Sequence, residues 1–320
     1  MYSRQELVKM YEDLVFARLY EQKVVDLFGS GKLPGFYHLA IGQEAVQIGV
    51  LHALGENDWI APHPRCHPLY ALKAGPRDFT AEMIGKPAGC CGGMASYPHF
   101  YAPHLRVCPA NGVLGNVPAI GLGFAKGLKL DKSDAVLVIG LGDGEINEGI
   151  VSECFNLAKI YDLPVCYYIE NNHLAISTVW EEVNSIPNPT ERGKGFGIPG
   201  GVYDGNDILL VRETMEEAIA RARKGEITIN TYNVTRWRGH FEGDRHDLYR
   251  DMKQVEFAMK YEDPVKIYEK YLLKNNILDK DDFEKIHKEQ QAIVDDAYEY
   301  ALNLPDATAD YVIDPGKVYA

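Results

Sequence analysis

The chain has little of what secreted, membrane-spanning or nucleic-acid-binding proteins need. Six cysteines in 320 residues are too few for a disulfide scaffold, and Cys154 and Cys166 lie in apolar patterns typical of reduced thiols. No apolar run approaches the roughly 20 residues that span a bilayer, and the charged first residues are unlike a secretory signal. We therefore expect no membrane association and a cytoplasmic location.

Positive charge is also scarce. The 33 basic residues are outnumbered by 46 acidic ones, and the formal net charge of −13 argues against a nucleic-acid partner. With 46% hydrophobic residues the chain can bury a large core, and no repeat or low-complexity linker divides it. We expect a single α/β domain over residues 1–320, with a core at about 31–250 and a helical C-terminal region at about 251–320.

Apolar strands alternate with helices in the middle of the chain. A long amphipathic helix is expected over residues 5–28, before a turn around Pro34 and Gly35. Residues 135–140 and 165–170 have the composition of buried strands, and a helix from about Asn147 separates them. A further strand is expected over residues 227–236. The pattern predicts a parallel sheet with helices on both faces and helical N- and C-terminal extensions.

Residues 86–112 have no clear period, which predicts a long loop, and loops of that length are usually functional or disordered. This loop and the segment before it are rich in histidine and cysteine. No C-x-x-C pair or H-x₃₋₅-H ending is present, so we expect packed loop residues, with a zinc or iron site as the alternative. The residues concerned are His63, Cys66, His67, Cys90, Cys91, His99, His104 and Cys108.

Two consecutive predicted strands end in polar signatures. Gly142-Asp143-Gly144 follows the first, and Asn171-Asn172 follows the second. Ligands of open α/β sheets bind at the carboxyl ends of such strands, so the two signatures should be neighbours in space. The glycines allow a tight turn, and the amides opening the next helix favour a phosphate.

Asp143 would repel a phosphate at this position unless a cation lay between the two negative groups. Carboxylate, amide and backbone carbonyl oxygens are suited to Mg²⁺, and Asp143, Asn172 and the carbonyl of Leu174 can supply them. A dinucleotide fingerprint would need glycine where the chain has Glu145, and no nucleotide P-loop motif occurs. A glycine turn without a ligand is the remaining alternative.

The complete pattern, GDG followed by NN after residues 145–170, resembles the thiamin diphosphate motif. The sequence around it is similar to the alpha subunits of 2-oxo acid and acetoin dehydrogenase complexes. Three further blocks agree in order: GKLPGFYHLAIGQEAV (31–46), ANGVLG (110–115) and RWRGHFEGD (236–244). The resemblance covers roughly residues 11–250.

The resemblance implies the cofactors thiamin diphosphate and Mg²⁺. The resemblance implies that Mg²⁺ is ligated by Asp143, Asn172 and the Leu174 carbonyl. It also implies that the diphosphate contacts the backbone at Gly144 and Glu145, beside Gly142.

The resemblance also implies residues for the rest of the cofactor and for the substrate. Arg65 matches an arginine that pairs with the diphosphate, and Gly112 and Leu114 match residues that contact the aminopyrimidine. His38 and His240 match histidines that line the active site, where His240 is a candidate for proton transfer.

The same resemblance implies partners: a beta subunit in an α2β2 heterotetramer, which supplies the activating glutamate, and a lipoyl-bearing acyltransferase. Phe241 stands where the pyruvate branch commonly has serine, which favours acetoin over pyruvate or a branched-chain 2-oxo acid. A transketolase-like half and a cofactor-free, non-catalytic partner are alternatives of other classes. Departures from the family are the loop sequence at 93–99, Cys66 for a glycine or alanine, and Glu145, which is expected to add an acidic group near the phosphates.

Overall fold

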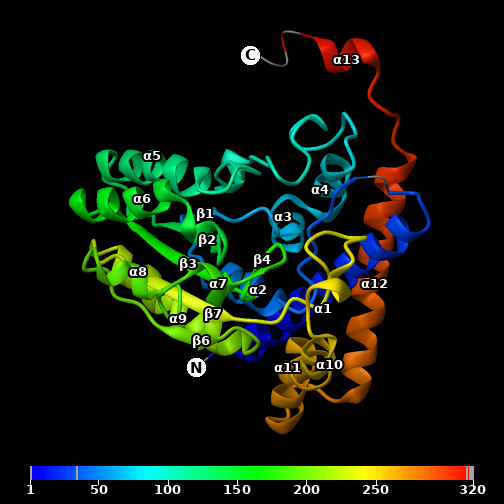
Figure 1. Ribbon diagram of the computed structural model, residues 1–320. Helices are drawn as coiled ribbons and strands as arrows, with labels where there is room; N and C mark the ends of the chain where they lie inside the picture. Colours follow the sequence, from blue (N-terminus) through cyan, green and yellow to red (C-terminus); the bar gives the residue numbers. More distant parts are fainter. Residues whose placement is uncertain (1, 34, 315, 317–320) are drawn as a thin grey trace.

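A five-stranded parallel sheet forms the centre of the computed structural model, which describes residues 2–33, 35–314 and 316 (Figure 1). The strand order is β1-β2-β3-β7-β6, and each neighbouring pair is parallel. The strands are β1 (Trp59–Ala61), β2 (Leu137–Gly142), β3 (Val165–Asn171), β6 (Val202–Asp204) and β7 (Ile229–Asn233). The predicted parallel α/β architecture is therefore confirmed. Pro34, in the predicted turn, lies outside the described residues.

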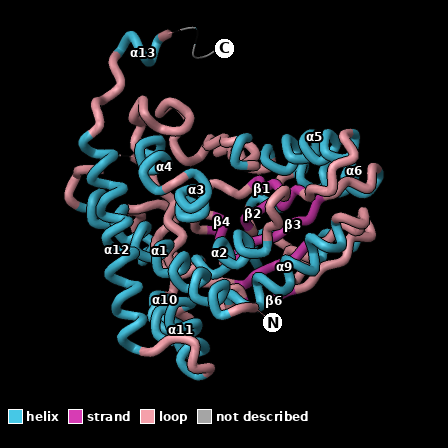
Figure 2. Tube along the Cα trace, turned by 180° about the vertical axis from the view of Figure 1, so that it is seen from behind, coloured by secondary structure: helices cyan, strands magenta, loops and turns pink. Residues whose placement is uncertain are grey.

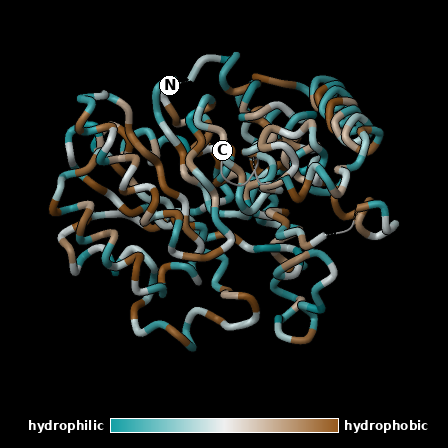
Figure 3. Tube along the Cα trace, turned by 90° about the horizontal axis from the view of Figure 1, so that it is seen from above, coloured by the Kyte–Doolittle hydropathy of each residue, from teal (hydrophilic) through white to brown (hydrophobic). Residues whose placement is uncertain are grey.

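Helices cover both faces of this sheet, so its strands are apolar on both sides. On one face, Leu137 and Ile139 pack in a core with α5 (Asn116–Leu130) and α6 (Gly149–Ile160). On the other, Val138 and Tyr168 pack in a core that includes α2 (Glu44–Ala53) and α9 (Ile208–Ala222). Figure 2 shows the helices around the strands from behind, and Figure 3 shows the hydropathy of each residue along the chain from above.

The N- and C-terminal helices pack on one another beside the sheet (Figure 1). The long helices α1 (Arg4–Gly29) and α12 (Lys280–Asn303) are in contact, and α12 also packs on α4 (Pro76–Met83). The others are α3 (His67–Ala74), α7 (Trp180–Val183), α8 (Glu191–Lys194), α10 (Met252–Tyr261), α11 (Pro264–Lys274) and α13 (Ala309–Ile313). Among the described residues, no helix is both long and apolar enough to cross a membrane.

Several predicted boundaries were wrong near the carboxyl end of the sheet. The strand expected over 227–236 ends at Asn233, because the chain then turns away and the Trp237 amide donates to the Ile41 carbonyl (3.0 Å). The short strand β1 and the hairpin of β4 (Leu174–Ala175) and β5 (Thr178–Val179) were not predicted. Strands of two or three residues carry too little periodicity to be recognised.

A buried arginine ties the helices to the segments at the sheet's carboxyl end. Arg18 on α1 donates to Glu44 on α2 (Nε–Oε1, 2.5 Å) and to Asp263 (Nη2–Oδ1, 3.2 Å). The Asp263 side chain also caps α11, and the guanidinium lies over the Trp237 ring, 4.3 Å from its centroid. These charges are almost wholly removed from water, so each depends on the others for compensation.

We expect Arg18→Ala to lower the free energy of unfolding by about 3–5 kcal/mol, because it leaves two buried carboxylates without their cation. Denaturant unfolding measures the change. Arg77→Ala, which removes an exposed ion pair with Asp296, is the control and should change stability far less. Equal losses in the two variants would contradict the role assigned to Arg18.

Candidate functional site

The GDG and NN signatures meet at the carboxyl ends of β2 and β3, where Gly142 pairs in register with Glu170. A Cβ atom on Gly142 would meet no atom within 4 Å, so this glycine faces open space in which a ligand can approach the backbone. At Gly144, by contrast, a Cβ atom would lie 2.8 Å from the Ala175 Cβ atom, because the β4–β5 hairpin packs on the turn. The turn therefore has an open side and a closed side.

The element that follows this turn differs from the helix predicted there. A 3₁₀ turn over Glu145–Asn147 comes first, and α6 begins only at Gly149 rather than near Asn147. Amides that face a phosphate at Gly144 and Glu145 would therefore belong to the GDG turn and to this short 3₁₀ turn. The N-terminus of α6 itself lies further along the chain.

The carboxylate of Asp143 is buried and has little contact with water. Its side chain is only 3% exposed, and burial raises its pKa to about 7, although the amides of Gly144 and Leu174 and the charge of Arg236 act in the opposite direction. A divalent cation beside the oxygens would restore the charged form. The donor set therefore fits a hard metal ion such as Mg²⁺.

The amide of Asn172 has a defined orientation. Its Nδ2 group donates to Gln43 Oε1 (2.9 Å), and its Oδ1 atom accepts from the Leu174 amide (3.2 Å). The oxygen thus points to the same Leu174 amide that lies against Asp143. The structure brings Asp143, Asn172 and Leu174 together, and their role as metal ligands stays a prediction.

Glu145 joins two predicted parts of the site. Its carboxylate is buried and accepts from the Gly115 amide (Oε1, 2.8 Å) and the Gly142 amide (Oε2, 3.4 Å). The side chain is thus turned toward backbone donors, and it ties the loop that contains Gly112 and Leu114 to the GDG turn. Gly112 lies against the His99 ring, and the Leu114 side chain is 46% exposed.

His38 and His240 form a direct pair, with their Nε2 atoms 3.2 Å apart. His38 Nδ1 lies 2.6 Å from the Tyr97 hydroxyl, which donates its own hydrogen to the Phe36 carbonyl (2.5 Å). At the other end, Arg65 Nη2 lies 3.3 Å from His240 Nδ1 and also donates to the His240 carbonyl (2.9 Å). These contacts form a chain from Arg65 to Phe36.

The direction of every hydrogen bond in this chain follows from its two ends. Because Tyr97 gives its hydrogen to a carbonyl, His38 Nδ1 must donate to the tyrosine oxygen. Arginine can only donate, so His240 Nδ1 must accept. His240 Nε2 therefore carries the hydrogen that His38 Nε2 accepts, and both rings have assigned tautomers.

The surroundings keep both rings neutral. Burial, reinforced by the charge of Arg65, lowers the pKa of His240 to about 4. Burial and Arg65 likewise lower the pKa of His38 to about 2. Neutral rings can donate at one nitrogen and accept at the other, which the assigned tautomers require.

Three residues of the site were not named in the sequence prediction of its functional groups: Gln43, Tyr97 and Arg236. Arg236 is only 1% exposed, and its charge acts on both Asp143 and His240. It therefore links the GDG turn and Asn172, which together we call the cradle, to the histidine pair. Gln43 and Arg236 lie inside two of the recognised sequence blocks, which was the available signal. Tyr97 lies in the loop without periodicity, where no local pattern indicated it.

We expect Tyr97→Phe to release the His38 tautomer, because the variant loses the acceptor of the Nδ1 hydrogen. Nitrogen-detected NMR of ¹⁵N-histidine-labelled protein should change from one protonated Nδ1 signal for His38 to an average of two tautomers. Tyr101→Phe, on an exposed side chain of the same loop, is the matched control. An unchanged His38 spectrum in Tyr97→Phe would contradict the hydrogen-bond directions given above.

Comparison with known families matches residues 12–310 to the family described as "Dehydrogenase E1 component". A pyruvate dehydrogenase E1 component subunit alpha-3, chloroplastic, from Oryza sativa subsp. japonica is 34% identical over 315 residues, or 95% of this chain and 73% of the relative. The alpha subunit of an acetoin:2,6-dichlorophenolindophenol oxidoreductase is 32% identical in Cupriavidus necator, with 95% of this chain and 91% of the relative covered. The protein of the same name from Bacillus subtilis is 35% identical, with 85% and 82% covered.

The matched residues 12–310 include the GDG turn, both histidines and the loop at 110–115. The chain belongs to the alpha-type dehydrogenase E1 family, whose members are thiamin diphosphate-dependent oxidoreductases acting on 2-oxo acids or acetoin.

Proposed function

We propose that this alpha subunit acts on acetoin, holds thiamin diphosphate with Mg²⁺, and works with a beta subunit in an α2β2 heterotetramer. In this proposal the acetyl group passes to a lipoyl-bearing acyltransferase. The coarser assignment, an E1 alpha subunit of a 2-oxo acid or acetoin dehydrogenase, follows from family membership. The finer statements rest on the arguments below.

The observation that carries the choice of acetoin is an aromatic wall beside the histidine pair. The rings of Phe36 and Phe241 lie 4.3 Å apart between centroids, and Phe36 also packs edge-on against His38 (4.7 Å). Acetoin is an uncharged hydroxyketone, so apolar rings next to neutral hydrogen-bonding rings match its chemistry. A 2-oxo acid brings a carboxylate, whereas the nearby Arg65 already donates to the carbonyls of Leu39 and His240.

When bound, thiamin diphosphate supplies the carbanion and the electron sink. This chain supplies orientation and proton transfer. Asp143 and the Asn172 amide would hold the metal and diphosphate end, and Arg65 donates to the His240 carbonyl. His38 Nε2 is a hydrogen-bond acceptor in its assigned tautomer. A substrate hydroxyl that takes the place of His240 could therefore donate its proton to His38.

Pyruvate is the second candidate, followed by a branched-chain 2-oxo acid, because relatives named for pyruvate dehydrogenase are frequent among the matches. A transketolase-like half would share the GDG turn but does not predict the blocks around His38 and His240. A cofactor-free, non-catalytic partner would lack metal-dependent cofactor binding. Cofactor binding and substrate assays distinguish these alternatives.

We expect the chain coexpressed with its beta partner to bind thiamin diphosphate only when Mg²⁺ is present. Asp143→Ala and Asn172→Ala should weaken this binding by at least about 100-fold, because each removes an oxygen ligand. Calorimetric titration measures the affinity. Asp131→Ala, an exposed carboxylate that precedes β2, is the control. Absence of binding in the unaltered complex would support a cofactor-free partner.

For the substrate, we expect kcat/KM of the reconstituted complex to be at least about tenfold higher with acetoin than with pyruvate or branched-chain 2-oxo acids, measured with an artificial electron acceptor. Phe241→Ser should reduce this preference by about tenfold, because it removes half of the aromatic wall. Phe257→Ser, at an exposed phenylalanine on α10, should leave the preference unchanged. A higher kcat/KM with pyruvate in the unaltered complex would overturn the choice of acetoin.

A further inference from the structure

Two residues of the histidine- and cysteine-rich region, His63 and Cys66, form a compact cluster with Glu170, which lies outside that region. His63 follows β1, Cys66 immediately precedes α3, and Glu170 lies in β3. Their ligand atoms all lie within 4.8 Å of one another, and each of the three side chains is buried. In the part of the chain that the structure describes, no other group of histidine, cysteine and acidic residues converges in this way.

The contacts within this cluster leave a carboxylate without hydrogen-bond donors. His63 Nε2 lies 3.5 Å from Cys66 Sγ and 3.1 Å from Glu170 Oε1. The second contact is an ion pair only when His63 is protonated, and neither oxygen of Glu170 has a hydrogen-bond donor by geometric criteria among the described residues. A single ring nitrogen cannot supply hydrogens to two acceptors, so a buried polar group remains unsatisfied.

Two of the three separations between the ligand atoms match those of a tetrahedral zinc site, and the third is at most 4.8 Å. Zinc binds nitrogen at about 2.0–2.1 Å, sulfur at about 2.3 Å and oxygen at about 2.0–2.2 Å, which separates neighbouring ligand atoms by about 3.3–3.6 Å. The observed 3.1 and 3.5 Å are close to these separations. A thiolate, a carboxylate and a neutral imidazole would also balance the two charges of the ion, which a buried site requires.

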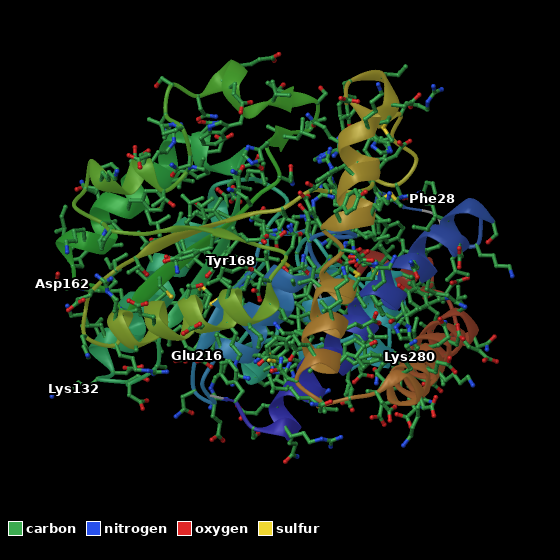
Figure 4. The ribbon with its side chains drawn as sticks, turned by 90° about the horizontal axis from the view of Figure 1, so that it is seen from below. Phe28, Lys132, Asp162, Tyr168, Glu216 and Lys280 are labelled. Atoms are coloured by element: carbon green, nitrogen blue, oxygen red, sulfur yellow. The ribbon has the colours of Figure 1, made fainter. Side chains whose placement is uncertain are left out.

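We propose that His63, Cys66 and Glu170 bind a zinc ion next to the cofactor cradle, since Glu170 pairs in register with Gly142 of the GDG turn. Three protein ligands leave one coordination position for water or another oxygen ligand. Tyr168, labelled inside the sheet-bearing half in Figure 4, lies beside the cluster with its hydroxyl 3.9 Å from Cys66 Sγ. The site is distinct from the predicted Mg²⁺ ligands, and the soft sulfur ligand favours zinc over magnesium.

The test measures zinc in the full-length chain purified with its beta partner from zinc-supplemented medium, after dialysis against excess Mg²⁺. We expect about one zinc per alpha chain by elemental mass spectrometry, and less than about a tenth of that in Cys66→Ala. Cys166→Ala, at a buried cysteine of β3 outside the cluster, is the matched control and should retain zinc. Asp143→Ala should also retain it, which separates this site from the magnesium site.

Replacement of zinc by cobalt gives a readout that does not depend on activity. The cobalt protein should have a thiolate-to-metal charge-transfer band, and Cys66→Ser, a nearly isosteric variant, should lose it. Absence of zinc from the unaltered complex, or equal zinc contents with and without Cys66, would overturn the proposal. Loss of zinc in Asp143→Ala with retention in Cys66→Ala would show that the ion had occupied the magnesium site instead.

Discussion

The buried contact between Arg18 and the carboxylates of Glu44 and Asp263 holds together the segments from which the site is built. It connects α1 to the start of α2 and to the start of α11, and its guanidinium covers the Trp237 ring. Backbone bonds then join the chain near Tyr37 and Ile41 to the chain near Trp237 and Glu242. Since a buried charge is tolerated only with its partners in position, the three segments cannot move independently.

This arrangement explains why His38 and His240 meet although they are far apart in the sequence. Each histidine lies on a segment that has no regular secondary structure, so its position depends on contacts with other parts of the chain. The strands β2 and β3 hold the GDG turn and Asn172 with the regularity of a parallel sheet. Arg236 acts electrostatically on both groups, and Glu145 adds the loop at 110–115 to the same assembly.

Much of the fold was predictable because long helices and buried strands carry a clear period. The strands around 137–142 and 165–171 and the helices that flank them were predicted within a few residues. The errors lie where local pattern is weakest: β1, the β4–β5 hairpin and the end of β7. There, backbone bonds to distant segments decide where the strand stops.

The sequence by itself determined the family resemblance, the parallel architecture and the residues of the cradle, because each depends on local composition and on the order of short motifs. Only the tertiary structure decided the partners of those residues. It directed Glu145 to the Gly115 and Gly142 amides, assigned the tautomers of His38 and His240 through Tyr97, and brought Glu170 to His63 and Cys66. These contacts join residues that are distant in the chain, and no periodicity along one sequence encodes which side chains a folded sheet brings together.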